Sequence, residues 1–451
     1  MQSIRMSLSH FKSLVLSMMA LCLFGSPQGQ ARDLPFAVGA PPFDWADYMA
    51  FAGEPPSSGR LRITGPWAGV DGERFRSILA YFEAATGIKT TFEGSDRSEE
   101  QLLLEIAAGT PPDLAIIPQP GLMRSLAKQG KLAPLPKGTS QWVADNYAAG
   151  ASWVALSDMD GDSFGFLYKT ELKSLIWYNP ATFADLGYAP PQTFEALQAL
   201  TARMIKEGRM PWCMGAGSGG ASGWPATDWI EDLMLRLEGP EFYDQWVAHG
   251  VPFNDVRVQS VFDAYGAFAR GAKMVEGGGK AVATRDFREA AAQLTELPPR
   301  CMMLRQASFI PAFFPKDTII GRDVDFTYFP TLKNAKNRPI LGSGTFVTMP
   351  KQSPEAERFI DFLKLPIAHE LWMAQSMFLT PHKGVDGQLA KEPSNQKMQT
   401  LLRAADIFRF DGSDMMPGGI GAGAFWRGML DYLAGQSAAD VTGKIEAAWP
   451  K

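Results

Sequence analysis

Between residues 61 and 129 the sequence alternates short apolar runs with helical patterns, and this order leaves few folds open. The expected strands and helices follow one another at residues 61–64, 72–86, 89–92, 99–108, 114–117 and 122–129. In the first helix the apolar residues recur at helical spacing, at Phe75, Ile78, Leu79 and Phe82. Strands joined by helices favour a parallel sheet that the helices cover, so an α/β fold is predicted.

The turns that follow these strands are the candidate ligand sites of this region. Sheets of this kind bind ligands beyond the carboxyl ends of their strands. Here three turns occupy those ends, at residues 67–71, 95–97 and 118–120. We therefore expect these turns to face a ligand.

A second informative stretch, residues 210–237, joins a loop of small residues to a helix. Its glycines let the backbone approach a partner closely, and Thr227 is placed to cap the helix, with Asp228 beside it. Trp224 and Trp229 add flat apolar faces near these donors, a combination that suits a sugar ring. We interpret Trp224 as ligand-facing and Trp229 as a core residue. The alternative is a surface loop with both tryptophans in the core.

The composition is that of a globular protein with a large core. Of 451 residues, 46% are apolar and 11% are aromatic, and the net charge is −5. No basic stripe and no face of interleaved basic and aromatic residues is present, so nucleic acid is not expected as a partner.

The N-terminus has the pattern of a secretory signal peptide over residues 1–31. A basic start precedes an apolar run too short to span a membrane, and a small-residue cleavage site ends at Ala31. Leu21 before Cys22 argues against a lipoprotein, so we expect a soluble periplasmic protein without a later transmembrane segment. Residues 32–60 lack periodicity and are expected to form an N-terminal extension laid over the surface.

Two cysteines remain after removal of this leader, Cys213 and Cys301. In an oxidising compartment we expect them to form a disulfide, which would tie two site loops together. The alternative is a pair of buried free thiols.

The rest of the chain repeats the mixture of strands and helices without a repeat or a low-complexity linker. Residues 325–330 are expected to form a strand that crosses between two domains, and residues 342–347 a glycine-rich turn entering a strand. Two lobes that share crossing strands fit this pattern better than separate domains in series.

Several motifs in a fixed order resemble one known family. In the first half they are residues 82–89 (FEAATGIK), 109–114 (GTPPDL), 130–135 (GKLAPL), 175–179 (LIWYN) and 191–195 (PQTFE). Two more, residues 223–231 (GWPATDWIE) and 306–310 (QASFI), are similar to an alpha-glucoside-binding subgroup. From residue 61 onwards the chain resembles the solute-binding proteins of carbohydrate ABC transporters, in the maltose-binding-like family.

The resemblance implies a two-lobed periplasmic-binding-protein fold of type II, a Venus flytrap in which each lobe is a sheet flanked by helices. It implies an N-lobe made of residues 61–167 and 329–380, and a C-lobe made of residues 168–328 and 381–451. The sugar would bind in the cleft between the lobes.

The resemblance also implies which residues contact the sugar. The expected ligand-binding residues are Trp67, Asp96, Arg97, Gln119, Ser222, Gly223, Trp224, Asp228, Ser308, Phe309 and Trp426. Two of them depart from the family pattern, because Trp67 stands where polar contacts are usual and Phe309 where tryptophan is frequent. Glu171 lies one residue away from the position of a hinge carboxylate.

The implied function is binding, with delivery of the sugar to a membrane permease by a monomer that needs no cofactor or metal. The main alternative is a secreted glycoside hydrolase, but no convincing pair of catalytic carboxylates stands out. The glycine pattern at residues 215–220 lacks a preceding strand, so a dinucleotide site is not expected. His249, His369 and His382 are too scattered in the sequence to predict a zinc site. A sensor module would need a membrane tether or a signalling domain, and neither is expected from this sequence.

Overall fold

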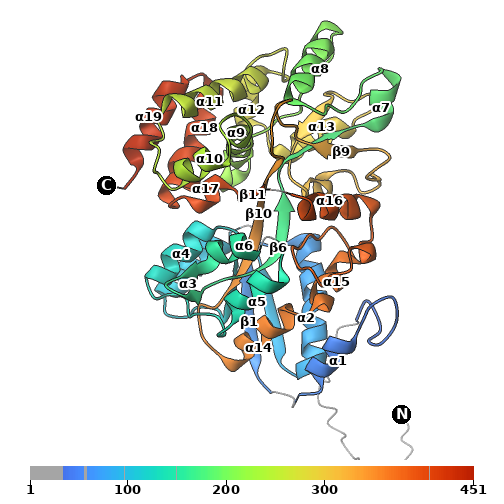
Figure 1. The fold of residues 1–451 in the computed structure, drawn as a ribbon, viewed down its shortest axis with the longest axis vertical. Helices are drawn as coiled ribbons and strands as arrows, with labels where there is room; N and C mark the ends of the chain where they lie inside the picture. The colour runs from blue at the N-terminus through green and yellow to red at the C-terminus, as the bar shows by residue number, and fades with distance from the viewer. Residues whose placement is uncertain (1–33, 55–57, 96, 149, 406, 451) are drawn as a thin grey trace, which may run out of the picture.

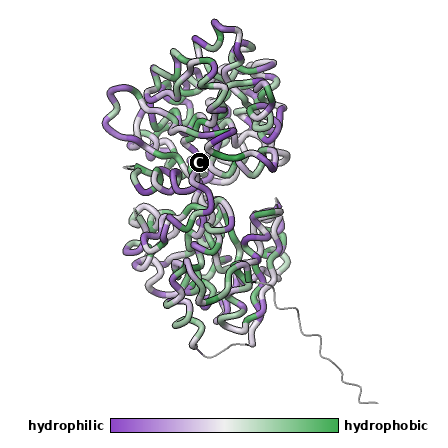
Figure 2. The backbone as a smooth tube through the Cα atoms, turned by 90° about the vertical axis from the view of Figure 1, so that its right-hand side faces the viewer, coloured by the Kyte–Doolittle hydropathy of each residue, from purple (hydrophilic) through white to green (hydrophobic). Residues whose placement is uncertain are grey.

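The computed structural model describes residues 34–54, 58–95, 97–148, 150–405 and 407–450, which form two lobes stacked along the long axis (Figure 1). Figure 2 shows the same two lobes from the side, meeting at a narrow waist. The predicted signal peptide, residues 1–31, lies outside the described residues. None of the helices within the described ranges combines the length and the hydropathy that a membrane span needs.

The N-lobe, the lower lobe in Figure 1, is built on the predicted alternation of strands and helices. Its parallel strands are β1 (Arg60–Gly65), β2 (Lys89–Gly94) and β3 (Leu114–Ile117), and the helices after them are α2 (Gly69–Thr86), α3 (Ser98–Ala107) and α4 (Pro120–Lys128). β1 lies between the other two, with Ile63 opposite both Phe92 and Leu114. The parallel α/β order predicted for this region is confirmed.

Two long strands, β6 (Phe166–Leu172) and β10 (Pro339–Thr348), run side by side from the N-lobe into the C-lobe (Figure 1). β10 pairs with β3 at one end, through Phe346 and Ile117, and with β11 (Ile407–Phe410) at the other. These strands are the physical link between the lobes, so the relative motion of the lobes must bend or twist them.

The crossing strand was expected at residues 325–330, and this expectation is wrong. β9 (Asp325–Tyr328) pairs instead with β7 (Leu175–Tyr178), which also pairs with β8 (Met303–Arg305) in a three-stranded sheet of the C-lobe. The glycines at 342 and 344, expected in a turn, lie inside β10. A Cβ atom on Gly342 would lie 2.6 Å from the carbonyl oxygen of Glu171, so these glycines allow β10 to pack closely.

The C-lobe, the upper lobe, surrounds the buried helix α9 (Trp224–Leu237). Its other helices are α7 (Pro180–Asp185), α8 (Phe194–Lys206), α10 (Pro240–Val247), α11 (Val256–Ala269), α12 (Gly278–Thr284), α13 (Phe287–Thr295), α18 (Trp426–Ala434) and α19 (Ala438–Ala448). Thr227 does not cap α9 as predicted. The helix begins at Trp224, three residues before Thr227, because Pro225 fits its first turn. The Thr227 hydroxyl donates to the carbonyl of Trp224 at 3.1 Å.

The segment predicted as a surface extension is in fact part of the N-lobe core. It contains α1 (Ala46–Ala52), and the side chains of Phe43, Trp45, Tyr48 and Phe51 are buried. The Tyr48 hydroxyl donates to the carbonyl of Tyr81 in α2 at 2.9 Å. The sequence lacks periodicity there because most of these contacts come from a loop and a single short helix.

The remaining elements complete the two lobes and their boundary. They are α5 (Thr139–Asn146), α6 (Gly150–Ser157), β4 (Asp158–Met159), β5 (Asp162–Ser163), α14 (Pro354–Leu363), α15 (Pro366–Met373), α16 (Pro393–Arg403) and α17 (Gly412–Met415). Short 3-10 turns occur at Gly219–Ala221, Ile310–Phe313 and Gly387–Leu389, and a π-helix at Gly419–Phe425. The lobe boundaries at residues 167/168, 328/329 and 380/381 stay a prediction.

Candidate ligand-binding cleft

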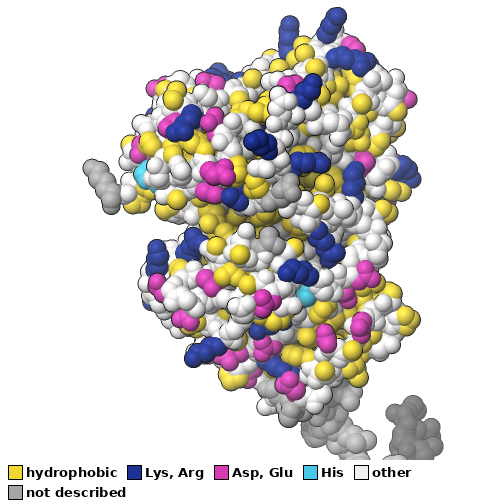
Figure 3. All heavy atoms as spheres, viewed as in Figure 1, with side chains coloured by type: hydrophobic (Ala, Val, Ile, Leu, Met, Phe, Trp, Pro, Cys, Tyr) yellow, Lys and Arg dark blue, Asp and Glu magenta, His cyan; other side chains and the backbone are white. Residues whose placement is uncertain are grey.

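Figure 3 shows the molecular surface hollowed along the boundary between the two lobes. The first turn of α2, from the N-lobe, contacts β6 at this boundary through Asp71 and Lys169. The segment after β8, from the C-lobe, contacts the same strand through Ser308 and Glu171. Side chains of the crossing strand β6 therefore contact residues of both lobes.

Four polar side chains form a continuous chain of contacts along β6. The ammonium group of Lys169 lies 2.9 Å from Asp71 and 3.0 Å from Glu171, and the Ser308 hydroxyl donates to Glu171 at 2.6 Å. Lys169 is 6% exposed and Asp71 is 36% exposed, so a carboxylate is presented to solvent while its cation is buried. Burial lowers the pKa of Lys169, but attraction to the two carboxylates outweighs this and raises the pKa above its ordinary value.

Asp71 and Lys169 were not among the residues expected to contact the ligand. The signal that marks Lys169 is the segment Lys169-Thr170-Glu171, where two charged residues alternate along a largely apolar strand. This spacing places Lys169 and Glu171 on one face of β6, and Lys173 follows directly after the strand. The structure brings Asp71 to that face from the turn at residues 67–71, which the sequence did single out.

Two aromatic rings follow from this polar chain, because Phe309 comes directly after Ser308 in the sequence and packs on Trp224. Trp224, the first residue of α9, is half-buried, and its ring centroid lies 5.0 Å from that of Phe287 and 5.8 Å from that of Phe309. The ammonium nitrogen of Lys173 lies 5.5 Å from the Trp224 centroid. Phe309 is also half-buried, so both rings keep some accessible apolar surface. By contrast, Trp229 is 3% exposed, which confirms its predicted place in the core.

The loop before α9 lies directly against the start of α18. Gly223 has a φ of +116°, and a Cβ atom there would lie 2.4 Å from the carbonyl oxygen of Trp426. Glycine is thus required both by conformation and by this close approach. Trp426 is 9% exposed, and among the described residues its Nε1–H finds no hydrogen-bond acceptor. The structure therefore brings the Trp224 and Trp426 segments together in the C-lobe.

The other residues expected to contact sugar from the N-lobe lie in different surroundings. Trp67 is 6% exposed, and its ring packs against Phe75 and Trp372 at centroid distances of 4.8 and 5.0 Å. Arg97 has an 82% exposed side chain that pairs with Glu100 on its own helix. Gln119 is a half-buried residue that precedes α4. Asp96 lies outside the described residues.

The remaining expected contacts from the C-lobe are more enclosed. The Ser222 hydroxyl donates to the carbonyl of Gly219 at 2.7 Å and accepts from the backbone of Ser218, so it orders its own loop. Ser308 is fully buried, and its hydroxyl donates to Glu171. Asp228 is also fully buried and offers a ligand no exposed surface.

A buried network of charges lies behind Trp224 and explains the position of Asp228. The ammonium group of Lys173 lies 2.8 Å from Asp228 and also pairs with Asp411. Arg305 pairs with the other oxygen of Asp228 at 3.3 Å. Burial raises the pKa of Asp228 to about 6, against the opposing effect of Lys173. The network holds Lys173, the residue after β6, beside Trp224, the first residue of α9.

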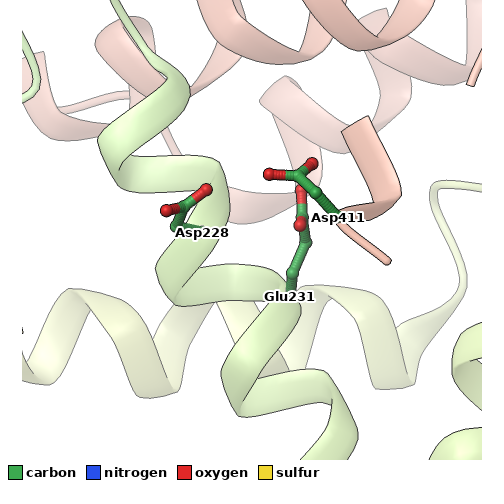
Figure 4. A group of neighbouring side chains, drawn as sticks. All are labelled: Asp228, Glu231 and Asp411. Atoms are coloured by element: carbon green, nitrogen blue, oxygen red, sulfur yellow. The ribbon is translucent and has the colours of Figure 1, made fainter. Parts of the chain in front are cut away.

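Figure 4 shows Asp228 and Glu231, both from α9, next to Asp411, which caps α17. Carboxylate oxygens of the three lie within 4.8 Å of one another, a spacing at which a cation can bind. The Lys173 ammonium already contacts Asp228 and Asp411, and Glu231 accepts the backbone N–H of Gly412 at 2.9 Å. Each carboxylate thus has a partner within the protein, and this group forms part of the structural network.

The predicted disulfide is confirmed. Cys213 and Cys301 are joined with an S–S distance of 1.97 Å and a Cα–Cα distance of 5.3 Å. The backbone N–H of Cys213 also donates to the carbonyl of Met303 in β8 at 2.8 Å. The bridge ties the start of the glycine-rich loop to the strand that leads to Ser308 and Phe309.

Comparison with known proteins gives relatives over nearly the whole chain. The chain is 48% identical over 428 residues to the "Alpha-glucosides-binding periplasmic protein AglE" of Rhizobium meliloti (strain 1021), covering 93% of each. It is 39% identical over 393 residues to the "Osmoprotective compounds-binding protein GgtB" of Synechocystis sp., covering 87% of this chain and 93% of the relative.

Solved structures share the two-lobed fold. The bacterial solute receptor AcbH, described with a preference for β-D-galactopyranose, has a TM-score of 0.75 at 19% identity and covers 87% of this chain and 98% of its own. A chitin oligosaccharide binding protein has a TM-score of 0.72 at 17% identity, again with 87% and 98% covered. At these identities the likeness shows the fold, and it confirms the predicted two-lobed α/β architecture.

Residues 67–370 match the family described as "Bacterial extracellular solute-binding protein". This match covers more than half of the chain and agrees with the family resemblance drawn from the motifs. Members of the family bind solutes and are not enzymes, so the glycoside hydrolase alternative is set aside. The chain belongs to the family of bacterial extracellular solute-binding proteins.

Proposed function

We propose that this protein binds an alpha-glucoside, or a related oligosaccharide, between its two lobes and delivers it to the permease of an ABC transporter. The observation that carries the proposal is that the half-buried rings of Trp224 and Phe309 pack together directly after Ser308, the inner end of a polar chain whose outer end is the partly exposed Asp71. The relative that is 48% identical is named as an alpha-glucoside-binding periplasmic protein, which supports the same ligand class here.

The roles of the side chains follow from their chemistry. Trp224 and Phe309 offer apolar ring faces for the C–H surface of a pyranose. Asp71 offers carboxylate oxygens that accept hydrogen bonds from sugar hydroxyls, and Lys169 holds that carboxylate in place.

Binding and delivery are linked through the crossing strands β6 and β10. A sugar that touches groups of both lobes favours the arrangement in which the lobes are close, so it shifts the population towards the closed form. A permease that recognises the closed form then receives loaded protein only. We expect the protein to act as a monomer without cofactor or metal, since a single chain carries both lobes.

The site of action that we propose is the periplasm, after removal of residues 1–31. Support comes from the leader pattern in the sequence, from the extracellular family and from the periplasmic relative. The bridge between Cys213 and Cys301 fits an oxidising compartment.

A thermal-shift screen of the purified mature protein tests the ligand class. Maltose, trehalose and sucrose are expected to raise the melting temperature, because a ligand of the native state stabilises it by mass action. Galactose and ribose serve as controls. Absence of a shift with every alpha-glucoside, or steady release of glucose from any of them, would overturn the proposal.

A further inference from the structure

The aromatic rings around Trp224 continue outwards beyond the site described above. Phe287 packs on Trp224 at a centroid distance of 5.0 Å, and Phe313 packs on Phe287 at 5.3 Å. Phe287 is buried, whereas Phe313 is 36% exposed. The three rings therefore form a strip that starts at Trp224 and ends at the surface, with one buried ring between two accessible ones.

Phe313 is unusual in its exposure. Among the large hydrophobic side chains that the structure describes as exposed, Phe313 is the only aromatic one. Its neighbour Phe314 is 7% exposed and packs on Trp177 at 5.9 Å, so the backbone at this position is anchored. The packing of Phe314 thus holds the Phe313 ring at the surface.

The guanidinium group of Arg288 packs against the ring of Phe313. The guanidinium carbon of Arg288 lies 5.2 Å from the Phe313 centroid and 4.6 Å from the Phe287 centroid. Its side chain is 43% exposed, and one nitrogen lies 3.1 Å from Asp286. The outer end of the strip therefore combines an apolar face with hydrogen-bond donors and acceptors, as the site at Trp224 does.

This combination suits a pyranose ring better than a protein partner. A sugar needs one flat apolar face and polar groups at the rim, and a single ring flanked by an ion pair provides both. A protein–protein contact needs a much larger area, and Phe313 is a single exposed ring. The two centroid distances, 5.0 and 5.3 Å, place Phe313 within about 10 Å of Trp224, which an oligosaccharide bound at Trp224 can span.

We infer that Phe313 and Arg288 form an outer subsite that binds a further sugar residue of an oligosaccharide whose first residues bind at Trp224. The inference rests on the proposed function and extends it to chain length. Affinity should rise with the number of sugar residues until the Phe313 subsite is filled, and then stay constant.

The test is calorimetric titration of the mature protein with glucose, maltose, maltotriose and maltotetraose. In the wild-type protein the longer sugars should bind more tightly than maltose. Phe313→Ala should weaken binding of the longer sugars about tenfold, the size of one aromatic contact, and leave the affinity for maltose within about twofold. Phe313→Tyr keeps the ring and should restore the affinity for the longer sugars.

Val256→Ala is the matched control, since Val256 is a 71% exposed apolar residue at the start of α11 in the same lobe. Melting temperatures without ligand verify that each variant is folded. Equal affinities of the wild type and Phe313→Ala for the longer sugars would overturn the subsite while the proposed function stands. If the wild type binds none of these sugars or other alpha-glucosides, the proposed function and the subsite both fail.

Discussion

The ammonium group of Lys169 lies 2.9 Å from the carboxylate of Asp71 and so joins the crossing strand β6 to the first turn of α2. Lys169 is buried against the ring of Trp372, whose centroid lies 5.5 Å away, whereas Asp71 is partly exposed. A buried cation thus positions a carboxylate that faces the boundary between the lobes. The results expected for variants of Lys169 and Asp71 depend on this arrangement.

Replacement of Lys169 by methionine should destabilise the protein by about 3 kcal/mol, because the carboxylates of Asp71 and Glu171 lose their shared partner in a largely buried place. Denaturant unfolding of the ligand-free protein measures the loss. Lys351→Met is the control: Lys351 pairs with Asp113, but its side chain is 61% exposed, and the loss there should stay below about 1 kcal/mol. Equal losses in the two variants would contradict the role given to Lys169.

Trp224 and Trp426 should affect sugar binding more than stability. Alanine at either position is expected to weaken binding of an alpha-glucoside at least tenfold, because each indole supplies one stacking face for the sugar. Trp229→Ala should instead cost about 3–5 kcal/mol of stability, because Trp229 packs on Trp212 inside the C-lobe at 5.0 Å. Melting curves and calorimetry on the same three variants separate the two effects. Unchanged affinity in folded Trp224→Ala and Trp426→Ala proteins would rule out stacking.

The disulfide should make a large contribution to stability. Cys213 and Cys301 are 88 positions apart, and a loop of this size corresponds to roughly 4–5 kcal/mol of loop-closure entropy. The double variant with serine at both positions should lose about that much in denaturant unfolding. Titration of the exported, unreduced wild-type protein should detect no free thiol. Two reactive thiols would contradict the bridge.

A buried histidine should make a destabilising contribution in mild acid. Burial, together with nearby His382, lowers the pKa of His369 well below its ordinary 6.5, so the folded protein keeps this ring neutral while the unfolded chain takes up a proton. At this site the unfolded state then binds more protons, so the contribution of His369 to stability drops by about 1.4 kcal/mol for each pH unit below 6.5. Between pH 7.5 and 5.5 the free energy of unfolding of the wild type should therefore change in the less stable direction relative to that of His369→Gln. An identical difference in both proteins would contradict this explanation.

The N-lobe was the most predictable part of the fold. Its strands and helices are local patterns with a clear period, and the residues from Phe75 to Phe82 already specify the buried face of α2. The family motifs add the two-lobed architecture. The crossing strands were harder to predict, since β10 contains glycines that look like a turn and its partners lie far away in the sequence.

The candidate site was only partly predictable for the same reason. Trp224 stood out because it sits where a glycine-rich loop meets a helix, and the sequence alone also indicated that Trp229 is buried. Asp71 and Lys169 come from different elements, 98 positions apart, and only the fold brings them together. Asp228 looked like a ligand residue at a helix start, but its partners Lys173 and Asp411 are supplied by distant segments.

The most direct test of interlobe sugar binding is a calorimetric titration with an alpha-glucoside disaccharide, run on the wild type and on Asp71→Asn. The change removes the charge of the carboxylate that faces the lobe boundary and keeps its size. We predict one site per chain in the wild type, and affinity weakened at least tenfold in the variant, as expected when a charge-assisted hydrogen bond of about 1.5–3 kcal/mol is removed. The melting temperature without ligand should fall, because buried Lys169 keeps only Glu171 as a carboxylate partner, so the titration is run well below it. No binding to the wild type, or equal affinity in the two proteins, would contradict the account.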